Sequence, residues 1–142
     1  MAATKYPFKK LEKYPHMKPA DILIWERFIE AHPDAYDSVQ YDLGVGLLPP
    51  FEVIVVPDTG GSDAELYLRK IDVVGFKDGV VDVIELKPNA GPGAVGQVEH
   101  NAFLYKNFVD KGSNPNPVII TDDFRGDVLI FAASKGVKII QV

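Results

Sequence analysis

The chain has 142 residues, of which 46% are hydrophobic, 25% are charged and none is cysteine, as expected for one globular domain. The absence of cysteine excludes disulfides, thiol nucleophiles and thiolate zinc sites, and no stretch has the roughly 20 apolar residues that cross a bilayer. We therefore expect a cytoplasmic protein without membrane association, in which any metal would be bound mainly by oxygen atoms.

The net charge of -5 is unevenly distributed along the chain. Residues 1–19 contain five lysines and one glutamate, about +4, which leaves about -9 for the remainder. Tyr6, Phe8 and Tyr14 alternate with these lysines, and three prolines prevent a continuous helix. This basic aromatic arm could follow phosphates, dock on a partner protein or remain a solvated lead-in. Residues 20–142 would form the single folded domain.

The first elements of the domain are a helix and two strands. Apolar residues recur with helical spacing from Asp21 until His32-Pro33 ends the pattern. Residues 38–46 alternate as a half-buried strand does, and residues 51–56 predict a second, short strand. Residues 57–65, which include two consecutive glycines, predict a mobile loop.

A β-hairpin comes next, because two β-rich runs flank Asp78-Gly79, the strongest short hairpin signal. The remaining predicted elements are a long helix over residues 94–110, a strand over 118–121, a short helix within 123–134 and a strand over 137–142. The order is helix, three or four strands, helix, strand, helix, strand. It predicts an α/β (α+β) fold with a mixed central sheet flanked by helices.

The two-residue turn sets the register of the hairpin. Lys77 pairs with Val80, and Asp72 then lies directly opposite Glu85. This is a non-hydrogen-bonded pair, in which Cβ atoms are about 4.5–5.5 Å apart. A β-bulge at Gly75 would shift the register by one residue and separate the two carboxylates.

Two carboxylates at this distance repel each other and need positive charge nearby. A divalent cation such as Mg²⁺, which prefers oxygen ligands, would supply it at Asp72 and Glu85. Alternatively, Lys70 and Lys87 neutralise the two acids as a salt-bridged hairpin at the solvent edge.

Polar side chains on the two long helices are further candidates. Glu26 lies at the margin of the first apolar stripe, next to Ile22 and Ile29, where it points into a cleft or remains a surface acid. Gln97 and Asn101 fall within the buried stripe of the second helix. A buried amide needs partners, so each bonds to nearby backbone or serves a site.

Together these residues resemble the PD-(D/E)xK nuclease superfamily, which has a restriction-endonuclease-like fold. The resemblance spans residues 20 to about 122 and rests on Asp72, on Glu85-Leu86-Lys87 in the next strand, on the upstream Glu26 and on the downstream Gln97. Ile71 stands where the motif's name has proline, and Asn101 stands where one subgroup has a tyrosine.

The resemblance implies a metal-dependent DNA nuclease that hydrolyses phosphodiester bonds. It implies that Asp72, Glu85 and the backbone carbonyl of Leu86 bind Mg²⁺, for which Mn²⁺ could substitute. It further implies that Lys87 positions the attacking water, that Glu26 binds a water of the metal or a second ion, and that Gln97 orients Lys87 or contacts the phosphate.

The small domain is also similar to phage-encoded members of that superfamily. An alternative function, which the acidic body of the chain favours, is a structural or adaptor protein of a viral particle, of the neck or head-completion type, with or without residual nuclease activity. Residues 1–19 would then dock on other subunits of the assembly. The location would be the host cytoplasm or the virion.

Overall fold

A computed structural model describes residues 4–48, 52–57 and 68–142 of the chain. The elements in this part are β1 (Tyr6–Pro7), α1 (Pro19–Ala31), β2 (Ser38–Leu48), β3 (Glu52–Pro57), β4 (Arg69–Lys77), β5 (Val80–Leu86), α2 (Pro92–Leu104), η2 (Tyr105–Val109), β6 (Asn116–Thr121), α3 (Gly126–Ser134) and β7 (Lys138–Gln141). Apart from Pro57, the expected loop over residues 57–65 lies outside the described residues. From α1 onward, the order of helices and strands is the predicted one.

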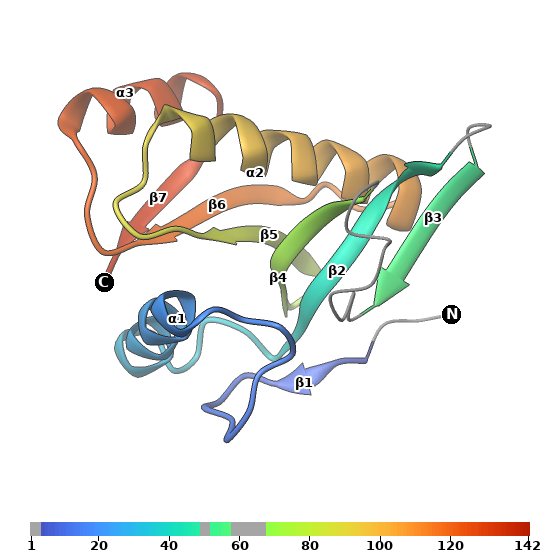
Figure 1. Ribbon diagram of the computed structural model, residues 1–142, viewed down its shortest axis with the longest axis horizontal. Coiled ribbons are helices and arrows are strands. Elements are labelled where there is room, and N and C mark those ends of the chain that lie inside the picture. The colour runs from blue at the N-terminus through green and yellow to red at the C-terminus, as the bar shows by residue number, and fades with distance from the viewer. Residues whose placement is uncertain (1–3, 49–51, 58–67) are drawn as a thin grey trace.

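The strands form one seven-stranded mixed sheet with the order β1-β2-β4-β5-β6-β7, and β3 pairs with residues 43–48 of β2, farther along that strand than β1. α2 and α3 lie along one face of the sheet, and α1 lies along the other (Figure 1). The helix expected over residues 94–110 is α2 followed directly by the π-helical turn η2. The fold is thus the mixed sheet flanked by helices that the sequence predicts. None of the described helices is long and apolar enough to span a membrane.

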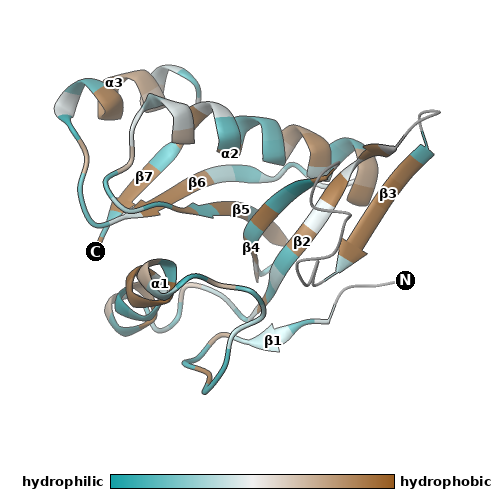
Figure 2. Ribbon diagram, in the orientation of Figure 1, coloured by the Kyte–Doolittle hydropathy of each residue, from teal (hydrophilic) through white to brown (hydrophobic). Residues whose placement is uncertain are grey.

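Each face of the sheet has its own hydrophobic core. Val98 of α2 packs with Ile119 of the sheet on one face. Trp25 and Phe28 of α1 pack with Ile84 on the other, and all of these side chains are buried. β3 and most of β7 are hydrophobic, whereas α2 has both hydrophobic and hydrophilic stretches (Figure 2). Burial on both faces is typical of a central sheet covered by helices.

The hairpin has the register that its turn predicts. Residues 73–77 of β4 pair one by one with residues 80–84 of β5, and no bulge interrupts the pairing at Gly75. In the turn, Asp78 and Gly79 have φ values of 48° and 79°. Positive φ at both central residues defines the type I′ turn, whose twist matches that of the flanking strands.

Halfway along β2 and β4, the alternation of side chains between the two faces of the sheet is interrupted. Tyr41 and Val73 belong to the core under α1, whereas Leu43 and Ile71 belong to the core under α2. The change in β2 occurs at Asp42, which has a φ of 54°, a left-handed conformation uncommon for a non-glycine residue. The β2–β4 register is the same on both sides of this break.

The N-terminal segment packs against the domain over its described part. Tyr6 of β1 pairs with Val39 of β2. The ring of Phe8 contacts the ring of Trp25 with a centroid distance of 5.6 Å, and Tyr14 is buried. These three aromatic residues of the expected arm therefore contribute to the core under α1.

Candidate active site

Asp72 and Glu85 lie where β4 and β5 separate. The ladder between the strands ends at Val73 and Ile84. One residue beyond, the Asp72 carboxylate accepts a 2.9 Å hydrogen bond at Oδ2 from the backbone N–H of Leu86. The N–H and C=O of a strand residue face the same neighbouring strand. The Leu86 carbonyl therefore lies on the same side of β5 as its N–H, the side of β4.

Both Asp72 and Glu85 are half-buried, and this burial dominates the electrostatics of their carboxyl groups. Burial raises the pKa of Asp72 to about 6, although the hydrogen bond from Leu86 counteracts the shift. Burial, together with the charge of Asp72, raises the pKa of Glu85 to about 8. Neighbouring acids with raised pKa are typical of sites that bind a cation or transfer protons.

The acid that α1 contributes to this cluster is Asp21. Its charge raises the pKa of both Asp72 and Glu85, and burial raises its own pKa. Glu26 lies about 140° around the helix from Asp21. There it accepts a 2.8 Å hydrogen bond from the Tyr14 hydroxyl of the N-terminal segment. The structure thus brings Asp21 to the carboxylate pair and Glu26 to the N-terminal segment.

Three basic residues surround the acids. Lys87 is exposed, and its charge, like that of Arg69, lowers the pKa of Glu85. The Lys70 ammonium donates a 2.7 Å hydrogen bond to the carbonyl of His16 and lies 3.3 Å from Oδ1 of the buried Asp42. The expected neutralisation by lysines is therefore partial, since the ion pair of Lys70 is made with Asp42.

The two amides of α2 have different surroundings. Asn101 is buried, as predicted, and its Nδ2 donates a 3.3 Å hydrogen bond to the carbonyl of Lys70, which ties α2 to β4. No group in the described part of the chain donates to Asn101 Oδ1. Gln97 is exposed, contrary to its expected place in the buried stripe. It lies one turn before Asn101 on the same side of the helix, with its amide open to solvent.

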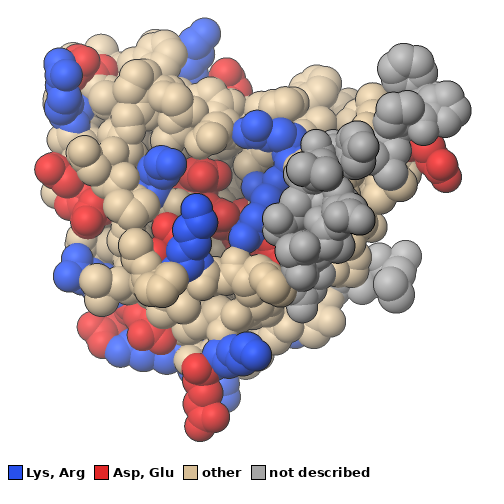
Figure 3. All heavy atoms as spheres, in the orientation of Figure 1, with Lys and Arg blue, Asp and Glu red and all other residues tan. Residues whose placement is uncertain are grey.

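Acidic and basic side chains gather at the middle of one face of the molecule, between α1 and α2 (Figure 3). Within residues 4–48, 52–57 and 68–142, no three Asp, Glu or His side chains are arranged to hold one ion. The carboxylates of Asp72 and Glu85 lie together at the strand separation. A hard divalent cation would complete its coordination with water or substrate oxygens.

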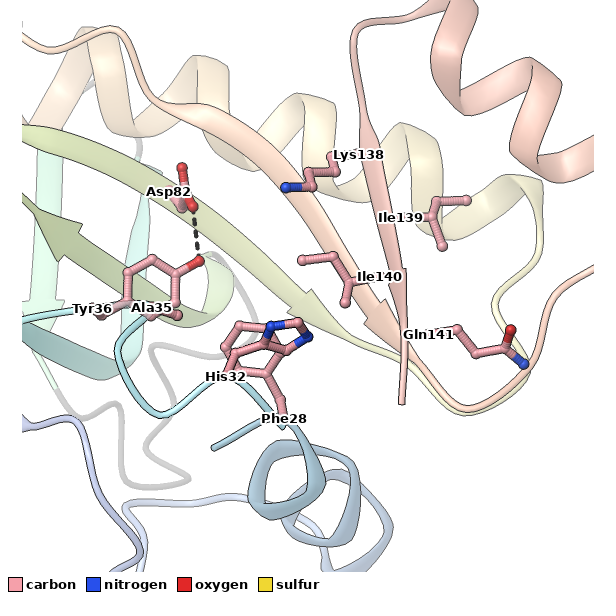
Figure 4. Close-up of a pocket in the computed structure, with 9 residues that line it drawn as sticks. All are labelled: Phe28, His32, Ala35, Tyr36, Asp82, Lys138, Ile139, Ile140 and Gln141. Carbon is pink, nitrogen blue, oxygen red and sulfur yellow. Dashed lines mark hydrogen bonds between the residues drawn. The ribbon is translucent and has the colours of Figure 1, made fainter. Parts of the chain in front are cut away.

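A cavity of about 550 Å³ lies between α1 and β7, near the end of β5 that is farther from Glu85. Figure 4 shows Phe28, His32, Tyr36, Asp82 and Lys138 among its lining residues. The Asp82 carboxylate accepts hydrogen bonds from the hydroxyl of Tyr36 (2.7 Å) and the amide of Asn116 (3.0 Å). Because both of its oxygens have partners, this acid has a structural role that is separate from the carboxylate pair.

Sequence reasoning missed Asp21 and Asp42. Asp21 lies in the first turn of α1, where an acid is common because it complements the helix dipole, so its type and position did not distinguish it. Asp42 falls in a run whose alternation continues unbroken from Val39 to Leu47. The change of face at this residue therefore leaves no mark on the pattern.

The fold is the mixed α+β fold also found in endonuclease-like structures. No protein-family model matches the sequence, and no curated protein matches it. Among solved structures, the EndoMS-dsDNA2 complex aligns with a TM-score of 0.51 and 14% identity, covering 94% of this chain and 49% of that chain. At these identities, similarity shows the fold alone.

Two further solved structures align with lower TM-scores. A repair endonuclease from Pyrococcus abyssi has a TM-score of 0.45 and 23% identity, covering 51% of this chain and 32% of that one. A protein of unknown function has a TM-score of 0.46 and 18% identity, covering 84% of this chain and 54% of that one. This chain therefore spans between about a third and about half of the length of all three.

Proposed function

We propose that this protein is a metal-dependent DNA nuclease that hydrolyses phosphodiester bonds. The observation that carries the proposal is the half-buried pair Asp72 and Glu85 at the separation of two strands, with Lys87 beside it. The fold shared with the EndoMS-dsDNA2 complex supports DNA as the substrate. The cations near the pair, Lys87 and Arg69, give this acidic chain local positive charge where a phosphate would approach.

The carboxylate pair suits Mg²⁺, with Mn²⁺ as a substitute. Magnesium commonly uses one or two carboxylates, keeps several waters and takes substrate phosphate oxygens as ligands. Asp72, Glu85 and the Leu86 carbonyl match this donor set. When bound, the ion would lower the pKa of water and neutralise charge on the phosphate.

The chain's own residues would position the reactants. Lys87, exposed beside Glu85, would orient the attacking water and stabilise the charge that develops on the phosphate oxygens. Asp21 would orient water near the pair, the role that the family resemblance gives to Glu26. The exposed amide of Gln97 would donate a hydrogen bond to the phosphate.

The adaptor alternative is less favoured by this structure. Docking through residues 1–19 requires a free arm, but Phe8 and Tyr14 of that segment contribute to the core under α1. Detaching them would expose aromatic surface to water, which costs free energy.

Cleavage assays test the proposal. The full chain is incubated at low salt with supercoiled, linear and single-stranded DNA, each in Mg²⁺, in Mn²⁺ and in EDTA. We expect cleavage in either metal and none in EDTA. Loss of the metal ligand in Asp72→Ala and of the cation in Lys87→Ala should each lower the rate by at least about a hundredfold.

Exposed residues remote from the pair provide matched controls. Asp127→Ala and Lys135→Ala remove the same side-chain types from the α3 region and should cut like the unmodified chain. The nuclease proposal is wrong if no DNA form is cut in either metal. It is equally wrong if Asp72→Ala cuts as fast as Asp127→Ala.

A further inference from the structure

A groove of about 360 Å³ lies between α2 and the ends of β2 and β4, a volume within the range of small-ligand pockets. We name it the α2 groove. Its lining includes Arg69 of β4, His100 and Phe103 of α2, and Phe108 of η2. Phe103 is 59% exposed, and Leu47 of β2, also in the lining, is 43% exposed. Large apolar side chains thus face an open cavity that also has basic groups.

Arg69 relates the α2 groove to the candidate active site. This residue lines the groove, and its charge also lowers the pKa of Glu85. Arg69 is adjacent in β4 to Lys70, whose carbonyl accepts the hydrogen bond from Asn101. β4 therefore joins the groove to the carboxylate pair over a few residues, a span of about 3.3 Å per residue.

A ligand of the α2 groove should combine negative charge for Arg69 with a flat apolar ring for Phe103. Nucleic acid has both features. Proteins that bind single strands combine cations along the backbone with exposed aromatic rings on which bases stack. Arg69 provides the cation, and Phe103 provides an exposed ring. In a duplex the faces of the bases are covered by their neighbours, so only an unpaired strand presents a free face to Phe103.

We propose that the α2 groove binds an unstacked base of a single-stranded or frayed DNA strand, next to the phosphate that lies at Asp72 and Glu85. This inference rests on the proposed nuclease function and specifies its substrate as DNA with an unpaired segment. Arg69 contacts the phosphate between the groove and the carboxylate pair, and Phe103 stacks on the base.

Binding without metal tests the groove separately from cleavage. The affinity of the full chain for a fluorescent single-stranded oligonucleotide and for the matching duplex is measured in EDTA at fixed low salt. We expect tighter binding of the single strand. Phe103→Ala should weaken single-strand binding by about 5-fold to 150-fold, the range for loss of one stacked base. Phe103→Leu keeps apolar bulk and should lose most of the same affinity.

Ile130→Ala is the matched control, because Ile130 is 74% exposed on α3 and should bind like the unmodified chain. A positional readout uses the same oligonucleotide carrying 5-iodouracil, with photocrosslinked residues mapped by mass spectrometry. We expect crosslinks at Phe103 or Phe108.

Unchanged single-strand affinity in Phe103→Ala, or crosslinks only outside the α2 groove, would overturn the inference. It would also be overturned if Phe103→Ala left DNA binding intact but converted a self-associated protein to monomer, since the groove would then bind a second copy. The nuclease proposal is judged independently by metal-dependent cleavage.

Discussion

Gly75 lies in β4 where the ring of Tyr36 packs closely against the strand. A Cβ added at this position would lie 2.6 Å from ring atoms of Tyr36, the residue whose hydroxyl donates to Asp82. Gly75→Ala should therefore lower the free energy of unfolding by about 1–3 kcal/mol through overpacking. Urea denaturation followed by circular dichroism measures the change.

The matched control is Gly96→Ala. Gly96 lies inside α2, where an added Cβ would meet no neighbouring side chain within 4 Å, so alanine should stabilise the helix by about 0.5–1 kcal/mol. Changes of opposite sign in the free energy of unfolding for Gly75→Ala and Gly96→Ala would support the close approach of Tyr36 to Gly75. Equal stabilisation by both would contradict it.

The carboxylate pair predicts a particular pH dependence in the metal-free protein. The pKa of Glu85 is raised from 4.5 to about 8 and that of Asp72 from 3.8 to about 6. The native state therefore binds more protons than the unfolded chain between about pH 4 and pH 8, and stability falls as pH rises through this window. In EDTA, Glu85→Gln should reduce that fall and be more stable than the unmodified chain at pH 8.

Thermal unfolding in EDTA across this pH range measures the effect, with Glu99→Gln on the exposed surface of α2 as the control. Adding Mg²⁺ at pH 8 should stabilise the unmodified chain and not Glu85→Gln, because a ligand stabilises only the state that binds it. Parallel pH profiles for the unmodified chain and Glu85→Gln would show that Glu85 does not have the raised pKa.

At the scale of elements, the hairpin was predictable because its turn chemistry is local. Asp78-Gly79 requires positive φ at two positions, and this selects the turn and the register of residues 73–77 with residues 80–84. Asp72 and Glu85 follow this ladder by one residue. The change of face at Asp42 was not predictable, because it depends on how two cores divide the sheet. A single left-handed aspartate within a strand has no distinctive sequence pattern.

The rotation of α1 could be predicted only in part. The apolar stripe correctly identified the buried face with Trp25 and Phe28. Two acids, Asp21 and Glu26, lie at different margins of this apolar stripe. Only the position of the helix on the sheet decides which of the two approaches Asp72. Here the N-terminal segment occupies the side of Glu26 through Tyr14.

Packing of the N-terminal segment predicts that it contributes to stability. The ring of Phe8 contacts the rings of Trp25, Phe28 and Tyr36 at centroid distances of 5.6, 6.0 and 5.4 Å. Phe8→Ala should lower the free energy of unfolding by about 2–3 kcal/mol, less than for a fully buried ring. Denaturant unfolding measures the loss.

Lys13→Ala, an exposed change in the same segment, should alter stability by less than about 0.5 kcal/mol. If Phe8→Ala and Lys13→Ala were equally stable, the segment would be a free arm in solution. Residues 1–19 would then be free to dock on a partner, as the adaptor alternative requires.

At the scale of the whole molecule, the element order after residue 18 was predictable because hydrophobic periodicity and turn signals are strong in this chain. The pairing of Tyr6–Pro7 with β2 was not, since a two-residue strand has no periodicity. The net charge of -5 also did not indicate where in the fold the acidic residues lie. Part of the acidic excess is gathered as Asp21, Asp72 and Glu85 at one place in the fold.

The central claim is that Asp72 and Glu85 together bind a divalent cation. Titration calorimetry with Mn²⁺ at pH 7 tests it on the full chain, with Asp72→Asn, Glu85→Gln and the remote control Asp127→Asn. We expect binding by the unmodified chain and by Asp127→Asn, with release of protons because the bound ion displaces them from acids of raised pKa. Both site variants should lose the binding. Equal Mn²⁺ binding by all four proteins, or none by the unmodified chain, would contradict the claim.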